Sequence, residues 1–363
     1  MPLQPAVAWT PHIEEMLASP GTIVIVGAVD VGKTSFCTVL ANASFEAGIS
    51  TAIVDADTGQ SEIGPPTTIG VSVLESPVHS PGDLRPRGLY FVGSTSPVGH
   101  VTAAVAGVRM LADRARELGA DQVIVDTTGL VKGLVARQLK THKLEILHPR
   151  HVVALQRSSE CEHFLRLFDV MAGCEVHRLD VSSDAHPKSQ MLRAQRRAVR
   201  LAEYFREART VEFSLDAVAT SGTYLRTGIP MEPKFLKFAS TVLRAEVPHG
   251  EFIGGTSERP IGVYLVASSG YDARGLEDLK QHFATSAIVV IPAIRYVNLA
   301  VGLIDDRLQT LAVGVIRKLD FRTRVASILT PLRSVHLAKA IRFGVLKLRP
   351  DGTEIARLRP GEV

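Results

Sequence analysis

Cysteine is scarce in this sequence. The 363-residue chain contains Cys37, Cys161 and Cys174, which are widely spaced and form no C-x-x-C pair. This pattern argues against a disulfide framework and a cysteine-based zinc module, and it predicts a reducing, cytoplasmic environment. The N-terminus has no signal-peptide pattern, and no run of ~18 apolar residues is available for a membrane helix. We therefore expect neither a signal peptide nor a membrane partner.

Acidic residues are slightly outnumbered. The chain has 41 Lys and Arg against 37 Asp and Glu, a formal charge of +4, and a pI near 9.0. The excess is concentrated between residues 317 and 349, where nine basic residues accompany one acid, a net charge of +8. Because phosphate neutralisation dominates nucleic-acid affinity, this segment predicts a polyanionic partner. An ordinary basic sheet face is the alternative.

A phosphate-binding loop is the strongest motif. An apolar run over residues 22–26 leads into GAVDVGKTS, which fits G-x-x-x-x-G-K-[ST], and a helical pattern begins at Lys33. Between a strand and a helix, such a loop holds phosphate oxygens with its backbone N–H groups, its lysine reaches the β- and γ-phosphates, and its threonine binds Mg²⁺. The predicted nucleotide-binding residues are Gly27, Ala28, Val29, Asp30, Val31, Gly32, Lys33, Thr34 and Ser35.

Two carboxylates follow the next predicted strand. Residues 51–55 form an apolar run that delivers Asp55, Asp57 and Gln60 at its carboxyl end. In an open α/β sheet, ligands bind at this edge. Two carboxylates beside a phosphate loop suit a metal ligand and a general base, although one of them could instead cap a turn.

The remaining pattern predicts a two-domain α/β protein. Further strands are expected over residues 89–92, 122–125 and 151–156, and helices over 101–118 and 132–147. This alternation predicts a P-loop NTPase fold with a doubly wound parallel sheet. After residue 210, short apolar runs separated by turns predict a smaller β-rich C-terminal domain. We place the two domains at 1–209 and 210–363.

Three histidines and an arginine-rich segment are further candidates for functional residues. His100, at the start of a predicted helix, could contact substrate or be structural. His148 and His151 have no further ligand nearby in sequence, so we expect no metal site there. The segment 187–209 is helical by spacing, and three of its arginines share one face. Such a face is commonly solvated, but phosphotransfer enzymes also use basic helices to close over the γ-phosphate.

Taken in order, these pieces resemble the polynucleotide 5′-hydroxyl kinase family, which includes the kinase subunit of the pre-mRNA cleavage complex and ribosomal-RNA-processing kinases. The resemblance covers roughly residues 20 to 210, and the β-rich tail is similar to the family's C-terminal domain. Its pieces are GAVDVGKTS at 27–35, DADTGQ at 55–60, GSTSPVGH at 93–100, DTTGLVKG at 126–133, VVALQRSSE at 152–160 and the arginines at 193–200.

The resemblance implies roles for individual residues. Gln60 and the two aspartates would form the family's acidic motif, and Thr127 and Gly129 would belong to a clasp that fixes the γ-phosphate and the RNA end. Arg193 and Arg197 would be the arginines of a lid.

We therefore predict transfer of the γ-phosphate of ATP, with Mg²⁺, to the 5′-hydroxyl end of RNA, with DNA as a possible acceptor. Lys33 would hold the phosphates, Thr34 and Asp55 would organise Mg²⁺, and Asp57 would accept the proton of the attacking hydroxyl. The roles of Asp55 and Asp57 are interchangeable at this level. Arg193 and Arg197 would close from the lid, and the basic tail would steer the polynucleotide. The oligomeric state is left open.

The sequence departs from the family pattern at two places, and three alternative functions are compatible with its motifs. Leu130 stands where family members place tryptophan after the clasp glycine, so a stacking platform worth ~1–3 kcal/mol is missing. The lead-in is too short for the eukaryotic members' adenine-holding domain. The alternatives are a GTPase, a dimeric regulatory ATPase and a scaffold without catalysis. The GTPase alternative rests on Asp126 and Gly129 fitting D-x-x-G, but no N-K-x-D follows residues 151–156.

Overall fold

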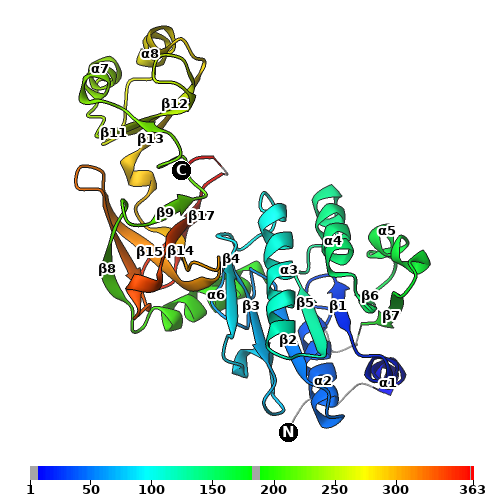
Figure 1. Ribbon diagram of the computed structural model, residues 1–363. Helices are drawn as coiled ribbons and strands as arrows, with labels where there is room; N and C mark the ends of the chain where they lie inside the picture. The colour runs from blue at the N-terminus through cyan, green and yellow to red at the C-terminus, as the bar shows by residue number, and fades with distance from the viewer. Residues whose placement is uncertain (1–6, 182–188, 360) are drawn as a thin grey trace. The chain divides into compact units, whose positions relative to one another are not determined.

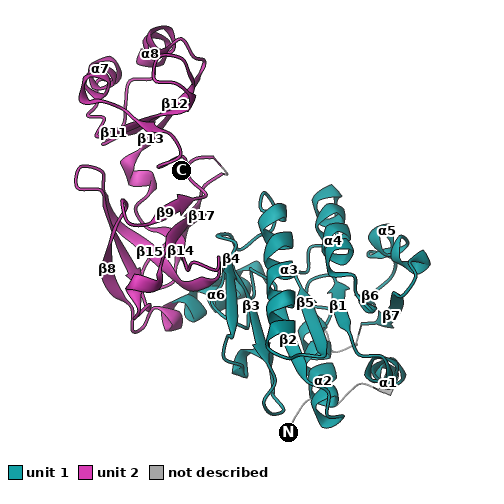
Figure 2. Ribbon diagram, viewed as in Figure 1, with its two compact units in different colours: residues 1–201 teal, residues 202–363 magenta. Residues whose placement is uncertain are grey.

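The chain is divided into two compact units. The computed structural model describes residues 7–181, 189–359 and 361–363, and the division falls after Leu201 (Figure 2). The boundary predicted from sequence followed residue 209. The arginine helix spans Gln190–Tyr204, and residues 182–188 of the segment before it lie outside the described residues.

The first unit is built around a seven-stranded sheet. Its order is β4-β3-β2-β5-β1-β6-β7, and β3 alone runs opposite to the other six strands. The strands are β1 Thr22–Gly27, β2 Thr51–Ala56, β3 Thr68–Val73, β4 Gly88–Phe91, β5 Gln122–Thr127, β6 His151–Gln156 and β7 Glu175–Asp180. The helices are α1 Thr10–Ala18, α2 Lys33–Glu46, α3 Val101–Glu117, α4 Leu134–Leu147, α5 Glu162–Leu165 and α6.

Helices cover both faces of this sheet (Figure 1). Alternate residues of β1 point to opposite faces, as the strand period of two requires. Val24 and Val26 join the core beneath α3 and α4, while Ile23 and Ile25 join the core beneath α1 and α2. Burial on both faces explains the continuous apolar runs of the central strands. The predicted doubly wound P-loop fold is confirmed.

The sequence prediction omits β3 and β7, which lie toward the two ends of the sheet. β3 follows two prolines, and its glycine and serine weakened the strand pattern. β7 buries only His177 and Leu179 fully, so it lacks an apolar run. Strands near a sheet edge need fewer apolar residues, and their sequence signal is correspondingly weak.

The strand order brings three strand ends together. β1 leads into the phosphate loop, and β5 lies between β1 and β2. Asp55 of β2 pairs in register with Asp126 of β5. Because these strands are parallel, their carboxyl ends open on the same edge of the sheet, where α/β proteins bind ligands.

The second unit contains two sheets. One has the order β10-β11-β12-β13, and the other β18-β17-β14-β15-β16-β8, with β9 beside β17. The strands are β8 Arg209–Ser214, β9 Ala219–Ser221, β10 Ile229–Pro230, β11 His249–Gly255, β12 Pro260–Ala267, β13 Ala287–Pro292, β14 Leu299–Ile304, β15 Thr310–Asp320, β16 Val325–Thr330, β17 Ala340–Leu348 and β18 Glu354–Arg357. The β-rich character predicted for this region is confirmed.

Two helices of the second unit were not predicted. α7 Pro233–Leu243 and α8 Gly275–Phe283 pack on the four-stranded sheet through a core that includes Leu243, Phe252 and Phe283. Both helices are short, and their apolar residues supply tertiary contacts that a local pattern does not reveal. Across the described parts of the chain, no helix has the length and apolar character needed to cross a membrane.

Candidate active site

The phosphate loop has the backbone that its motif requires. Gly32 precedes α2 with a φ of 91°, and Asp30 has a φ of 57°, both in the left-handed region. Left-handed backbone of this kind turns successive N–H groups toward the inside of a loop. Lys33, only 7% exposed, donates from Nζ to the carbonyl oxygen of Ala28 at 2.7 Å. The lysine is therefore held against the loop at the start of α2.

Thr34 and Asp126 are joined by a side-chain hydrogen bond at the start of α2. Thr34 Oγ1 donates to Asp126 Oδ2 at 2.6 Å, whereas the buried Asp126 Oδ1 has no hydrogen-bond partner among the described residues. Burial raises the pKa of Asp126 to about 6, and the nearby charge of Lys33 opposes that rise. A hydroxyl and a buried carboxylate oxygen are the oxygen ligands that Mg²⁺ prefers, so these residues fit that ion.

Asp55 organises the turn that follows β2. Its Oδ2 accepts from the backbone N–H groups of Glu62 and Ile63, the latter at 3.0 Å, and its Oδ1 accepts from Asp57 N at 3.1 Å. Burial raises the pKa of Asp55 to about 7, with a further contribution from the charge of Asp126, while these amide donors oppose the shift. Both oxygens of Asp55 are therefore engaged by protein.

Asp57 has a freer carboxylate than Asp55. Its Oδ1 accepts from Gly59 N at 3.0 Å and Gln60 N at 3.1 Å, which fixes the orientation of the side chain. Its Oδ2 accepts no hydrogen bond from the residues that the structure describes, and the side chain lines the cleft. An oriented carboxylate with one available oxygen is suited to accept a proton.

The turn after β5 packs directly against the phosphate loop. A Cβ added at Gly129 would lie 2.7 Å from the Val29 backbone nitrogen, so only glycine allows this approach. Thr127 is fully buried, and its hydroxyl donates to Ile25 O at 2.7 Å. The buried Lys140 of α4 donates to Thr127 Oγ1 and to Thr128 O, each at 2.6 Å. Burial lowers the pKa of Lys140, and neighbouring lysines add to that effect.

The arginines of α6 reach the same region. Arg193 pairs with Asp30 of the phosphate loop at 3.1 Å, and its carbonyl oxygen accepts from Gln60 Nε2 at 3.4 Å. Arg200 donates to Glu62 O at 2.6 Å. Arg196 is exposed and lines the cleft. α6 is thus tied to both the phosphate loop and the acidic turn.

One cleft collects most of these groups. Its lining residues are Val29, Asp30, Gly32, Lys33, Thr34, Ser35, Asp55, Asp57, Gln60, Glu62, Asp126, Gly129 and Arg196. Ten of these are predicted site residues. The other predicted site residues are not among those that line the cleft, and they are Gly27, Ala28, Val31, His100, Thr127, Arg193 and Arg197. His100 is the half-buried residue at the start of α3.

Four residues of the site were not predicted from sequence, namely Glu62, Asp126, Arg196 and Lys140. Asp126 ends a predicted strand, and that position was the signal that could have placed it beside Asp55. Arg196 lies next to Arg197 in sequence but points to the cleft. Lys140 gave no signal, because a lysine on an amphipathic helix is ordinarily solvated.

The basic segment of the second unit is partly neutralised. Among the described residues, at least four of its nine basic side chains form ion pairs, three of them with acids from outside the segment. The pairs are Lys318–Asp320, Arg322–Glu246, Arg324–Asp216 and Arg333–Glu207. Because acids outside the segment pair with three of its arginines, the positive charge that it presents to a polyanion is smaller than the net charge of +8.

Comparison with known proteins identifies the relatives of this chain. Residues 27–207 match the family described as mRNA cleavage and polyadenylation factor CLP1 P-loop. The polyribonucleotide 5′-hydroxyl-kinase of Thermococcus kodakarensis is 32% identical over 350 residues, which cover 95% of this chain and 93% of that protein. The chain belongs to the polyribonucleotide 5′-hydroxyl-kinase family. The resemblance inferred from sequence is confirmed.

Other members of this kinase family and one solved structure agree. The Methanocaldococcus jannaschii polyribonucleotide 5′-hydroxyl-kinase is 31% identical over 343 residues, covering 93% of this chain and 90% of that protein. Clp1p, solved in a complex with Pcf11p, has a TM-score of 0.56 over 93% of this chain and 77% of Clp1p at 12% identity. That likeness concerns the fold.

Proposed function

We propose that this protein is an ATP- and Mg²⁺-dependent kinase that transfers the γ-phosphate to the 5′-hydroxyl end of RNA. The observation that carries the proposal is the convergence of Lys33, Asp57 and Asp126 from three strand ends on one cleft. A phosphate-binding lysine, a base and a metal-binding carboxylate are the parts that phosphoryl transfer to a hydroxyl needs. The relatives of this chain are named polyribonucleotide 5′-hydroxyl-kinases, so we take the 5′-hydroxyl end of RNA as the acceptor. Three free cysteines are in keeping with the reducing cytoplasm as its location.

In this mechanism the loop amides and Lys33 hold the β- and γ-phosphates, because N–H groups and an ammonium in a partly buried site bind anions strongly. Thr34 and Asp126 would hold Mg²⁺. We assign the metal-facing carboxylate to Asp126, and not to Asp55 as proposed from sequence, because backbone amides already engage Asp55. When bound, Mg²⁺ would neutralise charge on the phosphate oxygens.

Asp57 accepts the proton of the 5′-hydroxyl, and its Oδ1 bonds to the following turn hold it in place. Arg193, Arg196 and Arg197 of α6 stabilise the charge that spreads over the transferring phosphoryl group. Gly129 lets the turn after β5 approach the phosphate loop. Lys140 stabilises that turn by donating to the carbonyl oxygen of Thr128. Leu130, in place of an aromatic platform, leaves the terminal base without a stacking partner at this position.

The proposal is tested by transfer from γ-labelled ATP. Purified protein is incubated with Mg²⁺ and a 5′-hydroxyl RNA oligonucleotide, and the matched acceptor control is the same RNA already carrying a 5′-phosphate. We expect label on the 5′-hydroxyl RNA alone, with the DNA of identical sequence as a weaker acceptor. Release of labelled phosphate at the same rate with and without acceptor would instead identify a regulatory ATPase. Preference for GTP would favour the GTPase alternative.

The arginines of α6 provide a separate prediction. Arg193→Ala and Arg196→Ala should each lower kcat on the order of 10²-fold, because each removes a charge beside the phosphate loop. The KM for ATP should change less. The measurement is steady-state transfer at saturating RNA. Gln195→Ala, an exposed residue of the same helix, is the control. Rates for the arginine variants equal to that of the control would contradict the role of α6.

A further inference from the structure

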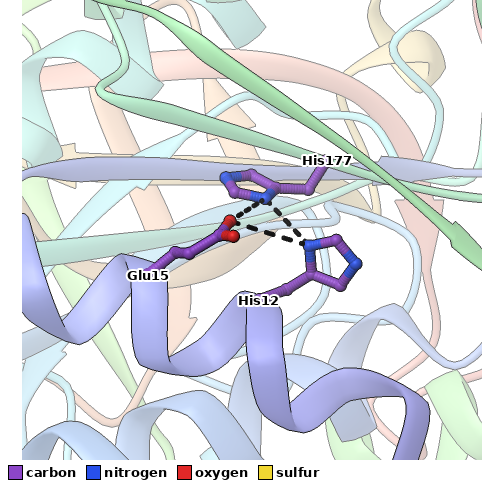
Figure 3. Close-up of side chains that lie close together, drawn as sticks. All are labelled: His12, Glu15 and His177. Carbon is purple, nitrogen blue, oxygen red and sulfur yellow. Dashed lines mark hydrogen bonds and ion pairs between the residues drawn. The ribbon is translucent and has the colours of Figure 1, made fainter.

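Two histidines and a glutamate come close together (Figure 3). None of the three lines the nucleotide cleft. His12 and Glu15 lie one turn apart on α1, and His177 lies in β7. His12 Nδ1 is 3.1 Å from His177 Nδ1. Glu15 Oε2 is 3.4 Å from His177 Nδ1 and 3.9 Å from His12 Nδ1. His177 is buried, His12 half-buried and Glu15 exposed, so the point where they meet is accessible from solvent.

When the rings of His151 and His177 are neutral, a chain of hydrogen bonds determines which nitrogen of His177 carries the proton. The carbonyl oxygen of Ser19 can only accept, so His151 Nε2, 2.9 Å away, donates its N–H to it. A neutral His151 then presents an unprotonated Nδ1 to His177 Nε2 at 3.1 Å. Glu175 Oε2 lies 3.5 Å from the same Nδ1, and the charge of Glu175 is balanced by its ion pair with Arg150. His177 Nε2 must therefore be the donor, which leaves the lone pair of His177 Nδ1 directed toward His12 and Glu15.

The neutral state of His177 agrees with its surroundings. Burial lowers the pKa of His177, and the neighbouring His151 and His12 lower it further, whereas Glu15 and Glu175 act in the opposite direction. With Nε2 engaged as the donor to His151, Nδ1 is the nitrogen of this ring that is open to a metal ion, which binds only an unprotonated histidine nitrogen. The carboxylate of Glu15 and this lone pair are both acceptors, and two acceptors 3.4 Å apart repel each other unless a positive group lies between them.

The separations between the three ligand atoms are close to those around a tetrahedral metal ion. Bonds of about 2.0–2.2 Å from Zn²⁺ to nitrogen and oxygen place neighbouring ligand atoms about 3.3–3.5 Å apart. The three separations here are 3.1, 3.4 and 3.9 Å. Two imidazoles and one carboxylate form a ligand set that Zn²⁺ uses, with a fourth position open to water.

We propose that His12, Glu15 and His177 form a Zn²⁺ site that links α1 to β7. In this site His12 Nδ1 is also unprotonated and Glu15 supplies one carboxylate oxygen. His151 is the outer partner: it accepts from His177 Nε2, is itself held by the Ser19 carbonyl, and so orients the His177 ring toward the metal.

A second grouping on the other side of His177 is a weaker candidate. His151, Glu175 and His177 also place their ligand atoms close together. However, Glu175 is already paired with Arg150 at 3.1 Å, and both histidine rings are buried. Glu15 has no ion pair with lysine or arginine among the described residues. The first grouping is therefore the one with an available carboxylate and access for the ion.

The test uses untagged, full-length protein that has been stripped of metal with a chelator. Zn²⁺ is titrated in the presence of excess Mg²⁺, which occupies the oxygen ligands of the nucleotide cleft, and Co²⁺ is titrated in parallel. We expect one Zn²⁺ per chain, a rise in Tm on binding, and the visible absorption of tetrahedral Co²⁺. His12→Ala and Glu15→Gln should each weaken Zn²⁺ binding at least about tenfold. His79→Ala, an exposed histidine of the same unit, should not.

Each result either supports or overturns the proposed Zn²⁺ site. The site is supported if His12→Ala and Glu15→Gln lose the cobalt spectrum while their Tm values without Zn²⁺ stay near that of the wild type. Absence of saturable Zn²⁺ binding by the wild type overturns it and leaves a proton shared between His12 and His177 as the occupant. Equal binding by the wild type and Glu15→Gln also overturns it, because the ion would then lie elsewhere. Glu15 is exposed, so its variant tests the site even if His12→Ala fails to fold.

Discussion

Lys33→Ala is expected to lower the rate of phosphoryl transfer to RNA by at least about 10³-fold. The side chain is nearly buried at the start of α2 and is held beside the loop by its bond to Ala28 O. Its ammonium neutralises charge on the phosphates in a site that is shielded from water, where the interaction is stronger than in bulk solvent. Alanine removes that charge and leaves the loop amides to act alone.

The measurement is single-turnover transfer from γ-labelled ATP, together with ATP affinity from a binding titration. Lys132→Ala is the matched control, because Lys132 is an exposed lysine of the same unit. Thermal unfolding shows whether the variant keeps its fold. A folded Lys33→Ala protein that transfers phosphate at the rate of the Lys132→Ala control would refute the assignment of the phosphate loop.

Asp57→Asn should lower transfer by roughly 10²- to 10⁴-fold while leaving ATP binding nearly unchanged, which is the usual effect of removing a general base. The asparagine can still accept from Gly59 N and Gln60 N, so the turn keeps its shape. What it loses is the ability to take the proton of the 5′-hydroxyl. The measurement is kcat for transfer at saturating ATP and RNA, with Tm recorded for each variant.

Asp55→Asn is the comparison that makes this prediction specific. Both oxygens of Asp55 accept from backbone N–H groups, and an amide in its place turns one acceptor into a donor. An unpaired buried group costs about 1–3 kcal/mol, so we expect a lower Tm in Asp55→Asn and an unchanged Tm in Asp57→Asn. A lower Tm in Asp57→Asn with an unchanged Tm in Asp55→Asn would exchange the structural role and the role of base between the two residues. Full transfer by Asp57→Asn would rule out Asp57 as the base.

Much of the site could be predicted from sequence because its main parts are local. The G-x-x-x-x-G-K-[ST] spacing itself specifies the left-handed turn at Gly32 and the lysine at the start of α2. Asp57 follows an apolar strand and could be placed at the ligand edge by that position. In the second unit, local patterns predicted the β-rich character but missed α7 and α8.

The sequence by itself therefore predicted a nucleoside-triphosphate site at a loop between a strand and a helix. Only the tertiary structure decided which strands are neighbours, and this placed Asp126 beside Thr34 and left Asp55 to support a turn. It also joined His12 to His177 across 165 positions of the chain. The physical reason is that a phosphate loop is closed by contacts within one short segment. Strand order and the meeting of distant side chains depend on how whole helices and strands pack.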